Sequence, residues 1–191
     1  MSDLNIKPFS MFFDLKTGLS REQQPTRRTL SNMKGMYADA AAFEAALKAN
    51  DELVYEFYEL KLPETPGDLL FGSSIVYPGK VGNEYFMTKG HFHAILDTSE
   101  VYYCLSGKGY MLMESPEGDW DAKPMTPGEA VYVPKRYAHR SINTGNERLV
   151  TFFVFRADAG HDYGTIEANG YRKLIVEKDG EPVIVNNPRW K

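Results

Sequence analysis

The sequence predicts an all-β fold of many short strands, closed into a sandwich or a small barrel and preceded by a short helical region. Segments of alternating apolar and polar residues recur along most of the chain, and Gly- or Pro-containing turns such as PGKVGN, SGKG and TPGE separate them. Aromatic residues form 13% of the chain, which favours sheets or pocket walls. The 191 residues fit one domain, 1–191, with an N-terminal part (1–50) and a barrel with a C-terminal hairpin (51–191).

The N-terminal part begins with SMFFDL (10–15), which predicts a short strand. The polar segment 21–35 predicts an exposed connection. Residues 39–51, DAAAFEAALKAND, give the one clear helix pattern, with Asp39 as its N-cap. One face of this helix is apolar and carries Phe43, Ala46 and Leu47.

Strand patterns dominate from residue 52 onwards. In 52–62 the side chains alternate, so that Tyr55, Phe57 and Glu59 share one face and Val54, Glu56 and Tyr58 the other. Further strands are predicted at 69–79, 84–96, 100–115, 129–134, 139–145 and 149–157. The segment 173–187 predicts a final hairpin that turns at Asp179-Gly180. A small barrel built from such strands can hold one small ligand.

Composition excludes several classes of function. The net charge is −4 and no basic stretch is present, so we expect no nucleic-acid partner. No run of eighteen apolar residues occurs, so we expect no membrane span. The single cysteine, Cys104, allows neither an intramolecular disulfide nor a thiolate zinc site, and it predicts a reducing, cytoplasmic setting.

Three histidines and one glutamate predict a metal site. His91 and His93 stand two residues apart, so on a strand both imidazoles leave the same face. Glu100 opens the next predicted strand, and His139 follows a Pro-containing bend that can return it across the barrel. A lone strand histidine is more often a hydrogen-bonded core or surface residue. Four such groups together favour one divalent ion, Fe²⁺, Mn²⁺, Ni²⁺ or Zn²⁺, in a catalytic role with open coordination positions.

These residues lie in two segments that resemble the motifs of the cupin superfamily. HFHAILDTSEVYYCLSG resembles the first motif, and GEAVYVPKRYAHRSIN resembles the second. The gap between His93 and Glu100 is longer than in most cupins, and Arg136 stands where many cupins have glycine. The long gap is typical of the cupin-type phosphoglucose isomerases of archaea and some bacteria. YPGKVGNEYFMTKG, ADAGHDYGTI and NNPRW also resemble that family, from the RRTLSNMKG region to the C-terminus.

The resemblance implies a cupin double-stranded β-helix, or jelly-roll barrel, that interconverts glucose 6-phosphate and fructose 6-phosphate at one divalent metal ion, with Fe²⁺ as the first choice. It implies a homodimer. The implied metal ligands are His91, His93, Glu100 and His139. The implied substrate contacts are Tyr55, Ser74, Thr88, Gly90, Tyr102, His161 and Tyr163. The implied catalytic residues are Glu100, His161 and Tyr163. Relatives commonly carry tyrosine at the position of Phe155, so this chain has one hydroxyl fewer there, although the ring can still pack.

The chemistry of an aldose–ketose isomerase leaves two routes open at Glu100. The carboxylate can take the C2 proton and form a cis-enediol. Coordination to a cation lowers carboxylate basicity, however, so a hydride shift from C2 to C1 is the alternative. For the phosphate, Thr88, Lys89 and Gly90 offer a hydroxyl, an ammonium and backbone N–H groups.

Two other classes of function fit the same four ligands. A non-haem iron cupin dioxygenase also uses three histidines and a glutamate, and would require O₂. A non-catalytic sugar-binding cupin is the second alternative, although such proteins often lack the full ligand set that this chain keeps.

Overall fold

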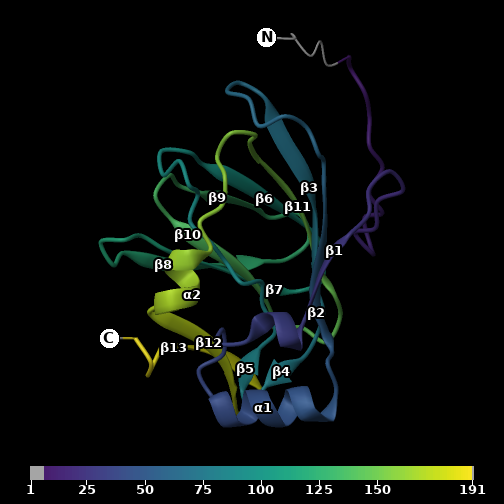
Figure 1. Cartoon of the computed structure of the whole chain (residues 1–191). Coiled ribbons are helices and arrows are strands. Elements are labelled where there is room, and N and C mark those ends of the chain that lie inside the picture. Colours follow the sequence, from purple (N-terminus) through teal and green to yellow (C-terminus); the bar gives the residue numbers. More distant parts are fainter. Residues whose placement is uncertain (1–6, 191) are drawn as a thin grey trace.

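The computed structural model describes residues 7–190 and confirms the predicted all-β fold of the cupin type (Figure 1). The ends of the predicted domain, residues 1 and 191, lie outside this range. The strands are β1 (Thr26–Thr29), β2 (Leu53–Glu59), β3 (Leu69–Val76), β4 (Lys80–Val81), β5 (Glu84–Tyr85), β6 (Glu100–Ser106), β7 (Gly109–Glu114), β8 (Trp120–Met125), β9 (Ala130–Val133), β10 (Ala138–Asn143), β11 (Leu149–Arg156), β12 (Lys173–Lys178) and β13 (Glu181–Asn186). The helices are α1 (Ala40–Ala49), α2 (Gly164–Asn169) and a 3-10 turn, η1 (Leu30–Met33).

The strands form two facing layers. One layer is a six-stranded sheet in the order β1-β2-β3-β11-β6-β9. The other layer consists of two smaller sheets, in the orders β10-β7-β8 and β13-β12-β5-β4. The segment after β5 connects these two sheets, because Met87 pairs with Ile142 and His91 with His139 of β10. The space between the two layers holds the main hydrophobic core, which includes residues from Leu30 to Ile175.

Helix α1 matches the sequence prediction. The Asp39 carboxylate accepts a hydrogen bond from the Ala42 amide and so caps the first turn. Phe43 is buried, and Ala46 and Leu47 pack against the core. The helix contacts β4 and lies across one end of the barrel (Figure 1).

The prediction of a strand at 10–15 is wrong. Only an isolated bridge joins Phe13 to Ser20, because Asp14 starts a turn by accepting hydrogen bonds from the amides of Lys16 and Thr17. The predicted exposed connection at 21–35 is also wrong in part. It contains β1, which pairs with β2, and η1, whose Leu30 and Met33 are buried.

The predicted continuous strand at 84–96 is regular only in β5. The pairing with β10 then shifts by one residue, from Met87 opposite Ile142 to His91 opposite His139. This is a β-bulge, with one extra residue on the 87–91 side. Gly90 supplies the left-handed backbone that the bulge needs, at φ 73°. A Cβ there would lie 2.5 Å from the Tyr171 hydroxyl oxygen.

Several other elements complete the comparison with the sequence. The C-terminal hairpin is confirmed, with β12 and β13 joined at Asp179 and Gly180, both at positive φ. Strand β8 and helix α2 were not predicted. Arg136 adopts φ 70°, which explains why many cupins have glycine at this position. Among residues 7–190, no helix is long and apolar enough to cross a membrane.

Candidate metal centre and substrate cavity

A cavity between the two layers brings the predicted site residues together. It has about 530 Å³ of empty space, including its open mouth. All seven predicted substrate contacts line it: Tyr55, Ser74, Thr88, Gly90, Tyr102, His161 and Tyr163. Three predicted metal ligands, His91, Glu100 and His139, also line it, and His93 lies directly behind them.

The bulge at Gly90 turns His91 into this cavity. Strand alternation alone would put His91 on the same face as Met87, which is buried away from the cavity. The extra residue reverses the alternation, so that Thr88 and His91 point into the cavity together with Ser141 and His139 of β10. Gly90 therefore places the His91 imidazole beside β10, the strand that carries His139.

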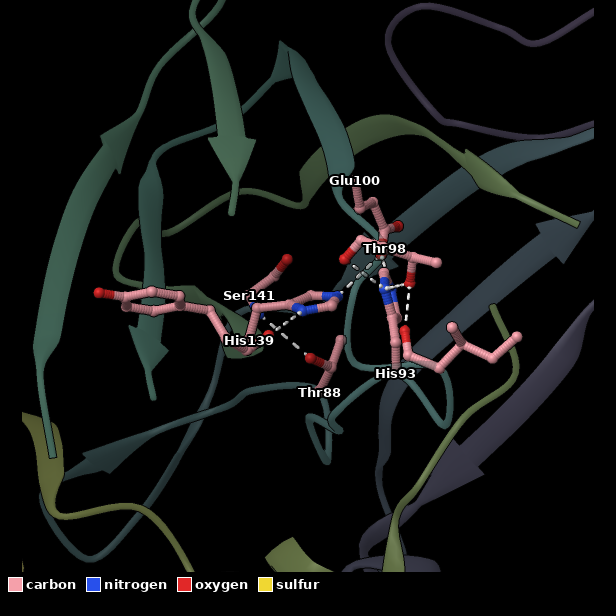
Figure 2. A network of polar contacts seen from close by, with 8 residues as sticks. Thr88, His93, Thr98, Glu100, His139 and Ser141 are labelled. Atoms are coloured by element: carbon pink, nitrogen blue, oxygen red, sulfur yellow. Dashed lines mark hydrogen bonds and ion pairs between the residues drawn. The ribbon is translucent and has the colours of Figure 1, made fainter. Parts of the chain in front are cut away.

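The four predicted ligands meet at one point. One ligand atom from each of His91, His93, Glu100 and His139 lies within 4.8 Å of the others. The Oε2 atom of Glu100 lies 3.1 Å from Nε2 of His93 and 2.9 Å from Nε2 of His139 (Figure 2). All four groups are nearly inaccessible to solvent.

Hydrogen bonds on the far side of two imidazoles identify the nitrogens that face the site. The Thr98 hydroxyl donates its hydrogen to the Ile95 carbonyl at 2.7 Å, so its oxygen must accept from Nδ1 of His93, at 2.7 Å (Figure 2). Nδ1 of His139 lies 3.3 Å from the Tyr137 carbonyl, which can only accept. Both histidines therefore carry a proton on Nδ1, and their Nε2 atoms are the nitrogens that lie near the Glu100 carboxylate.

The Nε2 atoms and the Glu100 oxygen all carry lone pairs, which repel one another at about 3 Å. A cation or a proton between these atoms removes the repulsion. Although Nε2 of His139 is 2.9 Å from Glu100, the angles do not make a hydrogen bond, and this nitrogen and Nε2 of His91 are buried without a partner. The donor set fits a divalent metal ion, which accepts neutral imidazole and carboxylate ligands.

Burial and neighbouring charges favour the ligand forms of these groups. Burial, followed by the nearby imidazoles of His139, His161 and His93, lowers the pKa of His91 well below its ordinary value, so this imidazole is neutral at pH 7. Burial raises the pKa of the Glu100 carboxyl, but positive charge and N–H donation at the positions of His139 and His93 outweigh it and lower that pKa to about 2, and a cation bound there would act in the same direction. The carboxylate is therefore ionised.

Aromatic side chains surround the side of the site that faces the cavity. The rings of His161 and Tyr163 stack on one another, with centroids 5.8 Å apart, and the His161 ring lies 4.5 Å from that of His91. Burial lowers the pKa of His161 and raises that of Tyr163 to about 12, so near pH 7 the imidazole is neutral and the phenol is protonated. The Phe155 ring packs between His93 and His161, as the sequence suggested.

The structure corrects the position of Lys89. Its ammonium forms an ion pair with Glu167 of α2 at 2.7 Å and does not line the cavity. The reason is the same alternation, since the side chains on either side of Thr88 point away from the cavity. The Thr88 hydroxyl oxygen accepts a hydrogen bond from the Ser141 amide at 3.1 Å, which leaves its own hydrogen free to donate.

Two residues at the candidate site, Glu59 and Thr98, were not predicted from the sequence. Glu59 lines the cavity, and burial, followed by the charge of Glu100, raises its pKa to about 7. The alternation of β2 already placed Glu59 on the face of Tyr55, so this signal was available. No sequence pattern indicated a role for Thr98, because its contact with His93 depends on the path of the loop before β6.

Comparisons with known proteins point to one family. The family described as Glucose-6-phosphate isomerase (GPI) matches residues 27–190. The glucose-6-phosphate isomerase of Thermococcus kodakarensis is 48% identical over 97% of this chain and 97% of its own length. That of Pyrococcus furiosus is 46% identical over 97% and 98%. Among solved structures, oxalate oxidase in complex with glycolate is similar with a TM-score of 0.49, at 15% identity over 59% of this chain and 56% of that one.

Proposed function

The chain belongs to the glucose-6-phosphate isomerase family, and on this premise we propose that it interconverts glucose 6-phosphate and fructose 6-phosphate with the help of one divalent metal ion. The observation that carries the metal is the position of two Nε2 atoms, of His93 and His139, at 3.1 and 2.9 Å from one oxygen of Glu100 inside a cavity. His91, His93, Glu100 and His139 are the proposed ligands.

Fe²⁺ is the first choice for this ion. Three neutral imidazoles and one carboxylate suit Fe²⁺, Mn²⁺, Ni²⁺ and Zn²⁺ alike, so availability to the protein decides among them. When bound, such an ion supplies Lewis-acid polarisation of a carbonyl and of the neighbouring hydroxyl.

Glu100 is the proposed base. Both contacts with the imidazoles use its Oε2 atom, so the other oxygen is left for the substrate. Tyr102 lies beside this carboxylate, as its place two residues further along β6 predicts. Glu100 takes the proton from C2 and returns it to C1 through a cis-enediol, while a second proton moves from O2 to O1. A hydride shift is the alternative, and solvent tritium in the product distinguishes the two, since only the enediol route exchanges with water.

His161 and Tyr163 are the proposed groups for opening the sugar ring. A neutral imidazole accepts a proton from the anomeric hydroxyl, and a protonated phenol donates one to the ring oxygen. Their stacked rings hold both groups at the same wall of the cavity, next to His91.

Tyr55, Ser74, Thr88 and Gly90 are the proposed contacts for the remainder of the substrate. Among the described residues no hydrogen bond uses the Gly90 amide, because the bulge leaves it unpaired, so it is available to a phosphate oxygen. The Thr88 hydroxyl hydrogen is free in the same region.

A coupled assay tests this function. Purified protein loaded with Fe²⁺, Mn²⁺, Ni²⁺ or Zn²⁺ is given fructose 6-phosphate under argon, and formation of glucose 6-phosphate is followed. Turnover without O₂ supports the isomerase and contradicts the dioxygenase. Absence of turnover with each of the four metals contradicts the isomerase and favours a sugar-binding protein.

We also propose a homodimer in the cytoplasm. A strand at 10–15 could have joined two copies by pairing with the sheet of a neighbour, but that segment forms no strand. Exposed apolar side chains on the six-stranded sheet support the dimer: Leu69 is 55% and Tyr132 62% exposed. The cytoplasm is supported by Cys104, a buried free thiol.

A further inference from the structure

Two consecutive arginines on β1 point to opposite faces of the six-stranded sheet. Arg27 lies opposite Glu56 on β2, and its Nε atom forms an ion pair with that carboxylate at 3.0 Å. Arg28 lies opposite Tyr55. Directly opposite residues of an antiparallel pair leave the same face of the sheet, and Tyr55 lines the cavity. The Arg28 side chain therefore leaves β1 on the cavity side.

The Arg28 guanidinium donates a hydrogen bond from Nη1 to the Arg27 carbonyl at 3.1 Å, and its charge acts on two tyrosines of the cavity wall, Tyr55 and Tyr163. Burial is the main cause that raises the pKa of the Tyr55 and Tyr163 hydroxyls. The positive charge of Arg28 lowers both pKa values. The Lys89 amide, next to the bulge glycine, lies at the same Tyr55 hydroxyl. Arg28 is half-buried, and within residues 7–190 no carboxylate forms an ion pair with it.

The cavity otherwise lacks a positive side chain. Its wall contains neither lysine nor arginine, and it contains two carboxylates, Glu59 and Glu100. Lys89, which the sequence offered as the cation for the phosphate, is paired with Glu167 outside. A phosphate dianion that enters this cavity needs a compensating charge, because burial of an unpaired charge is costly.

We propose that Arg28 binds the phosphate group of the substrate at the rim of the cavity, beside Tyr55, and so selects phosphorylated over free sugars. This proposal rests on the proposed isomerase function. A planar guanidinium on an edge strand can offer two parallel N–H donors to phosphate oxygens, whereas the amides and hydroxyls at Thr88 and Gly90 offer single donors.

The test compares three variants of the metal-loaded protein. Arg28→Gln removes the charge, and Arg28→Lys keeps it without the fork of donors. Arg27→Gln is the matched control, because its neighbouring guanidinium lies on the other face and pairs with Glu56. For each variant, KM and kcat for fructose 6-phosphate are measured together with binding of 6-phosphogluconate and gluconate by calorimetry. These two ligands differ only in the phosphate.

We expect Arg28→Gln to raise KM for fructose 6-phosphate and to weaken the binding of 6-phosphogluconate, each by about 10- to 100-fold. This is the size of effect expected for loss of a hydrogen bond to a charged group. Binding of gluconate and kcat stay within twofold. For Arg28→Lys, KM and the affinity for 6-phosphogluconate lie between those of the wild type and Arg28→Gln. For Arg27→Gln, both values equal those of the wild type. Added salt weakens the binding of 6-phosphogluconate less for Arg28→Gln than for the wild type.

Two outcomes overturn the proposal. One is an unchanged affinity of Arg28→Gln for 6-phosphogluconate, and the other is an equal loss for both ligands, which indicates a general effect on the cavity. Calorimetry needs no turnover, so the role of Arg28 is tested even if the wild type fails to convert fructose 6-phosphate. That failure contradicts the proposed function instead.

Discussion

Thr98→Val tests whether the hydrogen bond behind His93 holds the metal site in order. The Thr98 hydroxyl connects the Ile95 carbonyl to Nδ1 of His93, with 2.7 Å on each side, and Thr98 is 3% exposed. Valine keeps the shape and removes the side-chain oxygen that accepts from this Nδ1–H. The imidazole then keeps one acceptor, the Thr98 carbonyl, at the longer distance of 3.2 Å.

The expected effect is a loss of metal affinity rather than of the fold. Removing a group that orients a ligating histidine typically costs 10- to 100-fold in affinity. Since the carbonyl of residue 98 remains as a weaker acceptor, we expect the lower part of this range, about 10- to 30-fold, or about 1.4–2 kcal/mol.

Competition with a coloured chelator measures the Mn²⁺ affinity of wild type and variant. The matched control is Thr151→Val, because Thr151 is equally buried, its hydroxyl has no hydrogen-bond partner, and it does not line the cavity. Thr151→Val is expected to leave the Mn²⁺ affinity unchanged. An unchanged affinity in Thr98→Val, or an equal loss in both variants, refutes the role of this hydrogen bond.

Three further substitutions separate the roles of the cavity residues. Glu100→Gln should lower kcat by about 10²- to 10⁴-fold even at saturating metal, because an amide is no base, and a kcat within tenfold of the wild type contradicts this role. Thr88→Val should raise KM for fructose 6-phosphate about tenfold with little change in kcat, and an unchanged KM removes this hydroxyl from the phosphate site. Glu59→Gln should change how stability depends on pH in the metal-free protein. The folded-state pKa of Glu59 is raised to about 7, so the wild type loses stability as the pH rises from the unfolded value near 4.5 through 7. A shift of this size corresponds to at most about 3 kcal/mol, which solvent screening of a partly exposed group reduces to about 1–2 kcal/mol. Urea unfolding should therefore show Glu59→Gln more stable than the wild type by this amount at pH 8 and equal to it at pH 4.5; equal stabilities at pH 8 contradict the shifted pKa.

The convergence of the four proposed metal ligands was predictable because two kinds of signal agreed. The spacing of His91 and His93 fixes their common direction on any extended segment, and their rings lie 5.8 Å apart. The motif around Glu100 and His139 then supplied the long-range partners, which spacing alone cannot supply. The cap of α1 and the hairpin turn were predictable for a local reason, since Asp39, Asp179 and Gly180 determine their own turns.

The parts that failed depend on partners distant in the sequence. The bulge between Met87 and His91 exists only in relation to β10, so the sequence alone did not show that the Lys89 ammonium, offered there to the phosphate, pairs with Glu167 instead. The strand predicted at 10–15 has aromatic residues but forms no ladder. The pairing of Arg28 with Tyr55 likewise depends on the register of β1 on β2, which a polar segment does not reveal.

The most direct test of the central claim titrates chelator-stripped protein with Fe²⁺ or Mn²⁺ while bound metal and isomerase rate are measured in the same samples. We predict that one ion binds per chain and that the rate with fructose 6-phosphate rises in proportion to the bound ion. The double variant His91→Ala/His139→Ala, which lacks two of the four ligands, is predicted to bind no ion in the same range. Full activity of the stripped protein, or unchanged binding of the ion in the double variant, contradicts the proposed metal centre.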